Sequence, residues 1–385
     1  MPFMGMSAMD LKREFVALAG VEGTNISELC RRFGVSRTLA DRLLKRHAAE
    51  GEAGLLERSR RPKTSPGRTS PAIEAAVMAV RAEHPAWGGR KIARVLAMRG
   101  LAAPSPSTVT EILKRNGVAL GAHGGGAAPF VRFEHAAPND LWQMDFKGHV
   151  GMARGRLHPL TVLDDHSRFA IVLAACADQQ RETVKVHLTR AFERYGLPRR
   201  LITDNGPPWG TGRLARHGGE VWTELGVWLA EQDIHVSRSA PMHPQTLGKD
   251  ERFHRTLKAE ALSGPPFADI AAAARALGRW RDVYNLERPH EALGMAPPAS
   301  RHAVSPRPYT PAPEPFAYGP DDQPRKVWEG GRFDFKGRTW RICRAFTGKT
   351  IALRPTATDG RHHVVFRASR IATLDLNRPI GHPHV

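Results

Sequence analysis

The hydrophobic pattern changes near residue 140 from a helical period to the alternation of strands, and this change constrains the fold most strongly. Short segments rich in β-branched and aromatic residues predict three strands at Leu141–Phe146, Leu157–Leu163 and Phe169–Ala175. The polar turn 164–167 is short enough to join the last two as an antiparallel hairpin. Thr183–Tyr195 follows a helical period, and Arg200–Thr203 predicts a fourth, buried strand. Strands followed by a helix, a strand and further helices predict an α/β sheet domain.

Helical signals precede this domain. Residues 9–19 predict a first helix. Asn25 is expected to be the N-cap of a second helix, which ends at Gly34. Ser36 is expected to be the N-cap of a third helix, which runs to about Ala49. Two helices joined by a short turn with glycine are typical of a helix-turn-helix, and a helical hairpin without a DNA role is the alternative. The third helix is expected to turn polar side chains away from Leu39 and Leu43. The candidate DNA contacts there are Arg37, Thr38, Arg42 and Lys45.

A basic segment and a second helical unit follow. Residues 58–68 hold five basic residues and no acidic one, so Arg60 and Arg61 are candidate phosphate contacts in an extended linker. A solvated linker is the alternative. Further helices are expected from Pro71 to Val80, over Arg90–Arg99, and over Thr108–Asn116 behind an N-cap at Ser107. Arg90 and its basic neighbours are candidate phosphate contacts.

The composition limits the classes of binding partner that the chain is expected to have. A net charge of +19 with a pI near 10.7 favours a polyanion, with nucleic acid ahead of an acidic membrane. The sequence holds no apolar run of the roughly 18 residues that span a bilayer and no signal-peptide core, so a cytoplasmic protein is expected. Three well-separated cysteines favour neither a disulfide framework nor a zinc site.

Three carboxylates occupy positions where this sheet would gather them. Asp145 falls in the first strand, Asp204 just past the fourth, and Glu251 in the first turn of a helix beginning near Gly248. In that helix Phe253, Leu257 and Ala261 form the apolar face, and Glu251 lies roughly opposite. Oxygen-only ligands suit Mg²⁺ or Mn²⁺ and not zinc. Each carboxylate taken alone is more typical of an exposed surface residue.

Four segments carry a resemblance to a known family. They are LWQMDFKGHV (141–150), TVLDDHSRFA (161–170), LITDNGPPW (201–209) and HPQTLGKDERFHRTLKAE (243–260). Together they resemble the core of the integrase-type DDE transposases of bacterial insertion sequences, which share a ribonuclease-H-like fold with retroviral integrases. The segment 284–298 resembles the stretch that follows this core, and the helical units resemble the family's helix-turn-helix region.

The resemblance implies that Asp145, Asp204 and Glu251 are the catalytic and metal-binding triad, holding two Mg²⁺ or Mn²⁺ ions. It implies a DNA transposase that binds double-stranded element ends, cleaves and transfers strands, and assembles on DNA at least as a dimer. Further DNA contacts are expected at Lys249, Arg252, Arg255 and Lys258. Two features depart from the family: Leu247 stands where Asn is usual, and residues 209–222 form an insertion rich in Gly and Arg.

The expected organisation is multidomain. It comprises a helix-turn-helix unit (1–57), a basic linker (58–70), a second such unit (71–120), a ribonuclease-H-like catalytic core (130–298), a Pro-rich linker (299–324) and a small β-barrel (325–376). The rival functions are a non-catalytic DNA-binding regulator, a nuclease acting on RNA–DNA hybrids, and a structural protein at an acidic membrane. The retained carboxylates disfavour the first, the two helical units disfavour the second, and only charge supports the third.

Overall fold

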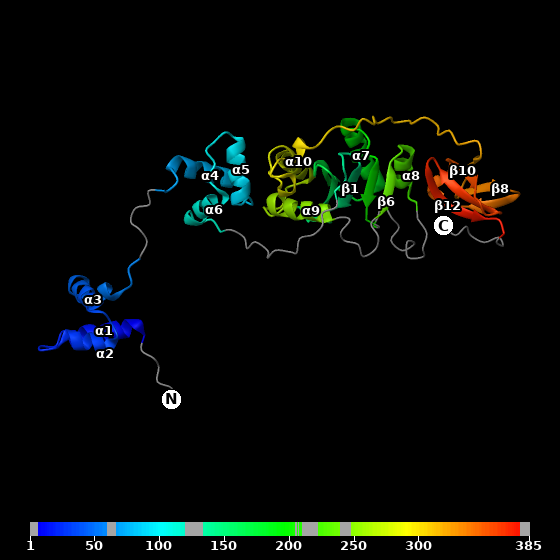
Figure 1. Cartoon of the computed structure of the whole chain (residues 1–385). Helices are drawn as coiled ribbons and strands as arrows, with labels where there is room; N and C mark the ends of the chain where they lie inside the picture. Colours follow the sequence, from blue (N-terminus) through cyan, green and yellow to red (C-terminus); the bar gives the residue numbers. More distant parts are fainter. Residues whose placement is uncertain are drawn as a thin grey trace. The chain divides into compact units, whose positions relative to one another are not determined.

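The computed structural model describes residues 7–59, 67–119, 134–204, 206, 208–209, 222–238 and 248–377, shown in Figure 1. The chain divides into two compact units, Met1–Arg68 and Thr69–Val385. Within the described ranges, no helix is both long and apolar enough to cross a membrane.

The first unit confirms the helix-turn-helix. Its helices are α1 (Ala8–Ala19), α2 (Ile26–Phe33) and α3 (Arg37–Glu50), followed by the short 3₁₀ helix η1 (Gly51–Leu55). The Asn25 side chain accepts the first free amides of α2, and Gly34 ends that helix in the left-handed conformation at φ 64°. Phe15, Leu29 and Ala40 are buried between the helices.

One detail of the third helix differs from the expectation. Leu39 was placed on the core side, but it is 47% exposed, and the core contact is made by Ala40 one position on. The face opposite Ala40 is polar. Thr38, Arg42 and Lys45 are exposed there, and Arg37 is exposed nearer to Ala40.

The second unit begins with three helices, α4 (Pro71–Glu83), α5 (Gly89–Met98) and α6 (Pro106–Arg115). The N-cap expected at Ser107 is wrong. Ser105 accepts the Thr108 amide and Pro106 occupies the first helical position, where a missing N–H costs nothing. Gly89 lets α5 approach α6 closely, since an added Cβ would stand 2.4 Å from the Pro106 carbonyl oxygen.

A mixed sheet forms the centre of this unit. Its strands are β1 (Leu141–Phe146), β2 (Val150–Gly151), β3 (Arg156–Asp164), β4 (Ala170–Cys176), β5 (Arg200–Thr203) and β6 (His235–Arg238). The ladders run β4-β3-β1-β5-β6, antiparallel from β4 to β1 and parallel from β1 to β6, while β2 extends the β3 hairpin. The four strands expected from the sequence are confirmed, and β2 and β6 are additional.

Helices cover both faces of the sheet (Figure 1). The helices are α7 (Arg181–Tyr195), α8 (Glu224–Glu231), α9 (Gly248–Ala261) and α10 (Ile270–Leu286). Because side chains alternate along a strand, Trp142 and Met144 of β1 pack with α7 and α8. Leu163 and Leu173 of the neighbouring strands face the other way and pack with α9 and α10. Polar residues of β1 such as Gln143 and Asp145 therefore share the α9 side.

The segment after α10 is fixed to the core. It passes through the 3₁₀ turns η4 (Glu291–Leu293) and η5 (Pro298–Ser300) and then runs extended. The Ser305 amide donates to the Tyr195 carbonyl and the Leu197 amide to the Arg307 carbonyl, both at 2.8 Å. Gly196, at φ 72°, lies against this strand-like stretch with no room for a Cβ. The first part of the expected linker is thus a strap across the core.

The C-terminal strands form open sheets. They are β7 (Gln323–Lys326), β8 (Arg332–Phe335), β9 (Arg338–Arg341), β10 (Thr350–Pro355), β11 (Arg361–Phe366) and β12 (Ser369–Asp375), with the 3₁₀ turn η6 (Arg344–Phe346). The ladders run β12-β11-β10-β7 and, separately, β8-β9. The closed barrel expected for 325–376 is not confirmed, because β7 and β12 are the two ends of an open ladder. Phe333 and Ile351 from the two sheets share one core, which Val227 of α8 joins.

We expect Asn285→Ala to destabilise the core domain by about 2 kcal/mol or more. The Asn285 side chain accepts from the Ala170 amide at 2.8 Å and donates to the Ala170 carbonyl at 3.1 Å, so truncation leaves two buried backbone groups unpaired. Urea unfolding followed by tryptophan fluorescence measures the loss, and amide exchange at the start of β4 should quicken.

The matched control is Leu286→Ala, the next residue on the same helix and 59% exposed. It should change the unfolding free energy by no more than about 0.5 kcal/mol. Equal effects of the two substitutions would contradict the role given to Asn285.

Candidate active site

Asp145 lies on β1 directly opposite Thr161 of β3. Its side chain points to the α9 side of the sheet, because Met144 and Phe146 on either side of it face the opposite core. The carboxyl group is 28% exposed, so it lies at the boundary between the core and solvent.

Asp204 follows β5, which pairs in parallel with β1. The carboxyl ends of these two strands therefore lie at the same edge of the sheet. The Gly206 amide donates to Asp204 Oδ1 at 3.0 Å, and the Trp209 indole donates to the same oxygen. The loop after β5 thus orients this carboxylate by holding one of its two oxygens.

Glu251 is exposed in the first turn of α9, with its neighbour Asp250 buried. Asp204 and Glu251 both act electrostatically on Asp145. Burial raises the pKa of Asp145 to about 7, and repulsion from Asp204 and then Glu251 contributes to the rise, which Lys147 partly opposes. The triad assignment stays a prediction: Asp204 and Glu251 each lie within electrostatic reach of Asp145, but among the described residues the close group of possible metal ligands at Asp145 contains neither of them.

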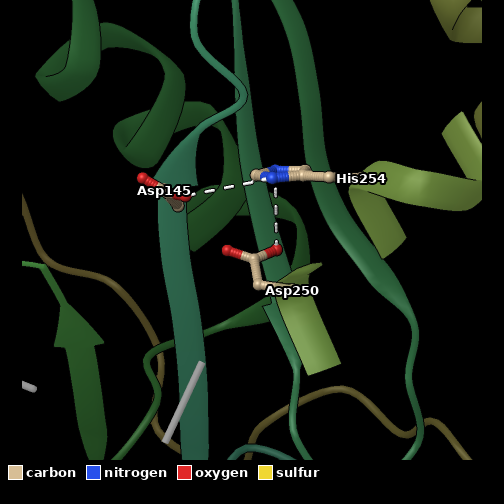
Figure 2. A group of neighbouring side chains, drawn as sticks. All are labelled: Asp145, Asp250 and His254. Atoms are coloured by element: carbon tan, nitrogen blue, oxygen red, sulfur yellow. Dashed lines mark ion pairs between the residues drawn. The ribbon is translucent and has the colours of Figure 1, made fainter. Parts of the chain in front are cut away.

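Sequence reasoning did not identify two further residues beside Asp145. Figure 2 shows Asp250 and His254, both on α9, turned toward it. One ligand atom from each of the three residues lies within 4.8 Å of the others. The signal was present in the sequence, since Asp250 and His254 fall on the same side of the helix as Phe253 and Leu257. A polar residue on the apolar face of a helix is expected to be buried, and this marks it as a candidate site residue.

Burial sets the charge of this group. Asp250 is 1% exposed, and burial followed by repulsion from Asp145 raises its pKa well above the usual value for a carboxyl. Burial also lowers the pKa of His254 to about 4, with Lys147 contributing. The imidazole is therefore neutral near pH 7. Its 3.9 Å approaches to Asp145 and Asp250, dashed in Figure 2, are contacts of a neutral ring.

A second buried carboxylate, that of Asp165, anchors the start of α9. It accepts hydrogen bonds from the Gln143 side chain at 2.8 Å, from the His135 amide at 2.9 Å and from the Lys249 ammonium. Asp165 is 1% exposed, and burial lowers the pKa of Lys249. Lys249, expected from sequence to hold phosphates, is thus half-buried and paired with Asp165, and its contact with DNA stays a prediction.

Apart from the four residues on α3 described above, the other expected DNA contacts fall in three groups. Arg252, Arg255 and Lys258 are exposed on α9. Arg90 is exposed and lies 3.6 Å from Glu291. The remaining ones, Arg60 and Arg61, lie outside the described residues, as do Leu247 and all of the 209–222 insertion except its two terminal tryptophans.

The donor set fits hard divalent cations. Asp145, Asp204 and Glu251 offer carboxylate oxygens only, which Mg²⁺ and Mn²⁺ prefer. Burial is the main cause of the raised pKa of Asp145, and repulsion from Asp204 and Glu251 adds to it, so part of the shift reflects negative charge beside this carboxyl. A bound cation would neutralise it.

Comparison with protein families assigns domains along the chain. Residues 135–244 and 232–298 match integrase core domain models, 40–113 a homeodomain-like domain, 11–63 a helix-turn-helix domain, and 322–379 the C-terminal domain of IS481 family transposases. These matches agree with the helical units and with the core, and they assign the C-terminal sheets to a transposase domain.

Individual relatives are more distant. An uncharacterized 39.2 kDa protein of insertion element IS476 from Xanthomonas euvesicatoria is 30% identical over 162 residues, 42% of this chain and 44% of that protein. An uncharacterized 31.7 kDa protein of IS407 from Burkholderia multivorans is 27% identical over 172 residues, 44% of this chain and 58% of its own. The chain spans about half the length of these curated relatives.

Among solved structures, a chain of the simian T-cell lymphotropic virus intasome in complex with PP2A regulatory subunit B56 gamma is similar to this one. The alignment covers 77% of this chain and 94% of the intasome chain, with 13% sequence identity and a TM-score of 0.38.

We expect Mg²⁺ binding to weaken as the pH falls below about 7. The cation binds the ionised carboxylate, while Asp145 with its pKa of about 7 holds a proton below that pH. The apparent affinity should fall by about ten-fold per pH unit on the acid side and level off on the alkaline side. Calorimetric titration in buffers of different ionisation enthalpy measures both the affinity and the proton released.

In the Asp145→Asn variant this pH dependence should disappear together with most of the binding. An affinity in the wild-type protein that is constant from roughly pH 5.5 to 8 would contradict the raised pKa.

We expect Lys249→Met to weaken Mg²⁺ binding by about 10- to 100-fold, the range for loss of a group that orients a ligand. The substitution leaves Asp165 without its cation and frees the helix start that carries Glu251. Lys258→Met, exposed on the same helix, is the matched control and should bind as the wild type does. Equal affinity in both variants would show that the anchor does not position the site.

Proposed function

We propose that the chain is an insertion-sequence transposase with an integrase core domain, and that it binds the ends of its element, cleaves them and joins them to target DNA. The observation that carries this proposal is the placement of Asp145 on β1 and of Asp204 at the same edge, after the parallel strand β5, with Glu251 in the first turn of α9 close enough to act on Asp145. Three carboxylates from separate elements of an integrase core would serve no packing purpose at the edge of a sheet.

In this proposal Asp145, Asp204 and Glu251 hold two divalent cations. When bound, such ions supply Lewis-acid activation of water and stabilise the charge on a leaving oxygen. The protein contributes the arrangement. Asp145 is fixed by its strand, Asp204 by the Gly206 and Trp209 hydrogen bonds, and Glu251 by the anchored start of α9.

The chemistry proceeds by two substitutions at phosphorus. Water attacks the phosphodiester at the element end, the bond from phosphorus to the 3′ oxygen breaks, and the water proton passes to solvent. The element then ends in a 3′-hydroxyl. That hydroxyl attacks a phosphodiester of the target, where the bond to the target 3′ oxygen breaks in turn, so the number of phosphodiester bonds is conserved in the second step.

DNA recognition is proposed for the helical units and α9. Arg37, Arg42 and Lys45 lie exposed on α3, the second helix of a helix-turn-helix, the position from which such motifs read the major groove. Arg252, Arg255 and Lys258 extend the exposed face of α9 beyond Glu251 and suit backbone phosphates. One triad serves one strand end at a time, so joining two ends requires at least a dimer on DNA.

We expect Asp145→Asn and Glu251→Gln to lower nicking and strand transfer by roughly 10⁴-fold, the scale for removing one member of a catalytic unit. Binding of end DNA should change by less than about two-fold at fixed salt, because neither residue is placed in the helical units. The assay uses labelled duplexes carrying the element end, with Mg²⁺ and with Mn²⁺.

The control is Glu193→Gln on α7, an exposed carboxylate away from the site. Strand transfer that survives both site substitutions would exclude the triad. Cleavage of RNA–DNA hybrids in preference to duplex ends would favour the rival nuclease, and end binding without any nicking by the wild type would favour a regulator.

A further inference from the structure

The group formed by Asp145, Asp250 and His254 differs chemically from the three-carboxylate cluster. It combines two carboxylates with an imidazole, and its ligand atoms lie within 4.8 Å of one another. It shares only Asp145 with the proposed catalytic triad. Figure 2 shows that Asp250 and His254 approach Asp145 from α9.

The Thr161 hydroxyl lies between three groups. Its oxygen is 2.9 Å from the Asp145 carbonyl oxygen, 2.9 Å from His254 Nε2 and 3.4 Å from Asp250 Oδ1. When the hydroxyl donates to the Asp145 carbonyl, Nε2 donates to the hydroxyl and the ring presents the lone pair of Nδ1. That nitrogen lies 3.9 Å from Asp145 Oδ2.

Asp250 supplies an independent indication of a ligand. Its Oδ1 lies near Thr161 and His254, but its Oδ2 is buried and has no hydrogen-bond partner within the described part of the chain. The residue is 1% exposed, so solvent does not supply that partner. A buried polar oxygen left unpaired is costly, and a cation between Asp145, Asp250 and His254 would satisfy it.

We propose that Asp145, Asp250 and His254 form a second cation site, selective for a transition-metal ion such as Co²⁺ or Zn²⁺. Imidazole nitrogen binds these ions well, whereas Mg²⁺ takes oxygen ligands and keeps its water. The second site would engage Asp145 through Oδ2, the oxygen that faces His254, and leave its other oxygen to the cluster with Asp204 and Glu251. The two adjoining sites would therefore bind different ions, because one offers only carboxylate oxygens and the other includes an imidazole nitrogen.

The test is titration of the full-length protein with Co²⁺ in excess Mg²⁺, followed by visible absorption. Coordination by an imidazole nitrogen should give ligand-field bands that saturate at one ion per chain. The bands should persist in Asp204→Asn and Glu251→Gln. In Asp250→Asn and His254→Ala, Co²⁺ binding should weaken by about 100-fold or more. Removing a group that only orients a metal ligand costs about 10- to 100-fold in affinity, and loss of a ligand itself should cost at least as much.

The matched control is His235→Ala, an exposed histidine of β6, which should bind Co²⁺ as the wild type does. Because Asp250 and His254 are buried, far-UV circular dichroism of each metal-free variant checks the fold. His254→Asn, which keeps a polar end of similar size, is the second variant for that position.

Unchanged Co²⁺ binding in folded His254→Ala or His254→Asn would overturn the second site. Loss of the bands in Glu251→Gln would also overturn it, since the ion would then occupy the carboxylate cluster. Neither result bears on the proposed transposase activity. Failure of that proposal would be an absence of Mg²⁺-dependent nicking by the wild type, whatever the Co²⁺ spectra show.

Discussion

The buried carboxylate of Asp165 holds together the two elements that carry the candidate site. It accepts from Gln143 on β1 and from Lys249 at the start of α9, and β1 and α9 also carry Asp145 and Glu251. A buried ion pair adds little net stability, but removing one partner is costly because the other charge stays buried. The pair therefore acts chiefly on geometry. Without it, the helix start would be held to the sheet mainly by the aromatic packing of Phe253, one turn further along.

Local patterns predicted the centre of the sheet well. The strands at 141–146 and 200–203 match the expectation at both ends, because a short apolar run between polar or glycine-containing turns is encoded locally. β6, which contains His235 and Arg238, has no such run, and its strand conformation comes from pairing with β5. The closed C-terminal barrel failed for a related reason. Alternation indicates which residues form strands, but closure depends on which edges meet, and here β7 and β12 stay at opposite ends of one ladder.

The candidate site was predictable to the extent that its residues lie in solvent-facing or strand-end positions. Asp145, Asp204 and Glu251 stand where strands end or where a helix begins, and their electrostatic coupling agrees with that placement. The sequence pattern does not single out Asp250 and His254, because both lie on the face of α9 that Phe253 and Leu257 mark as apolar. Lys249 was assigned to phosphate because its charge was visible in the sequence, while its buried partner Asp165 lies 84 positions away. Long-range polar pairs of this kind depend on the completed fold.

One face of helix α9 carries both apolar residues that stabilise the fold and a buried carboxyl that destabilises it. Phe253 packs edge to face on Tyr284 with ring centroids 4.9 Å apart, and Leu257 is fully buried, so the middle of the helix adheres to α10 by apolar contact. One turn earlier, the same face carries Asp250, which gains nothing from burial and lacks a partner for one oxygen. Burying a carboxyl there opposes stability unless it is compensated. The anchor at Lys249 and the aromatic contact at Phe253 flank this position, so the helix can keep an unfavourable group at the sheet. A group retained at such a cost beside Asp145 is best explained by binding, since packing alone would be served better by an apolar side chain.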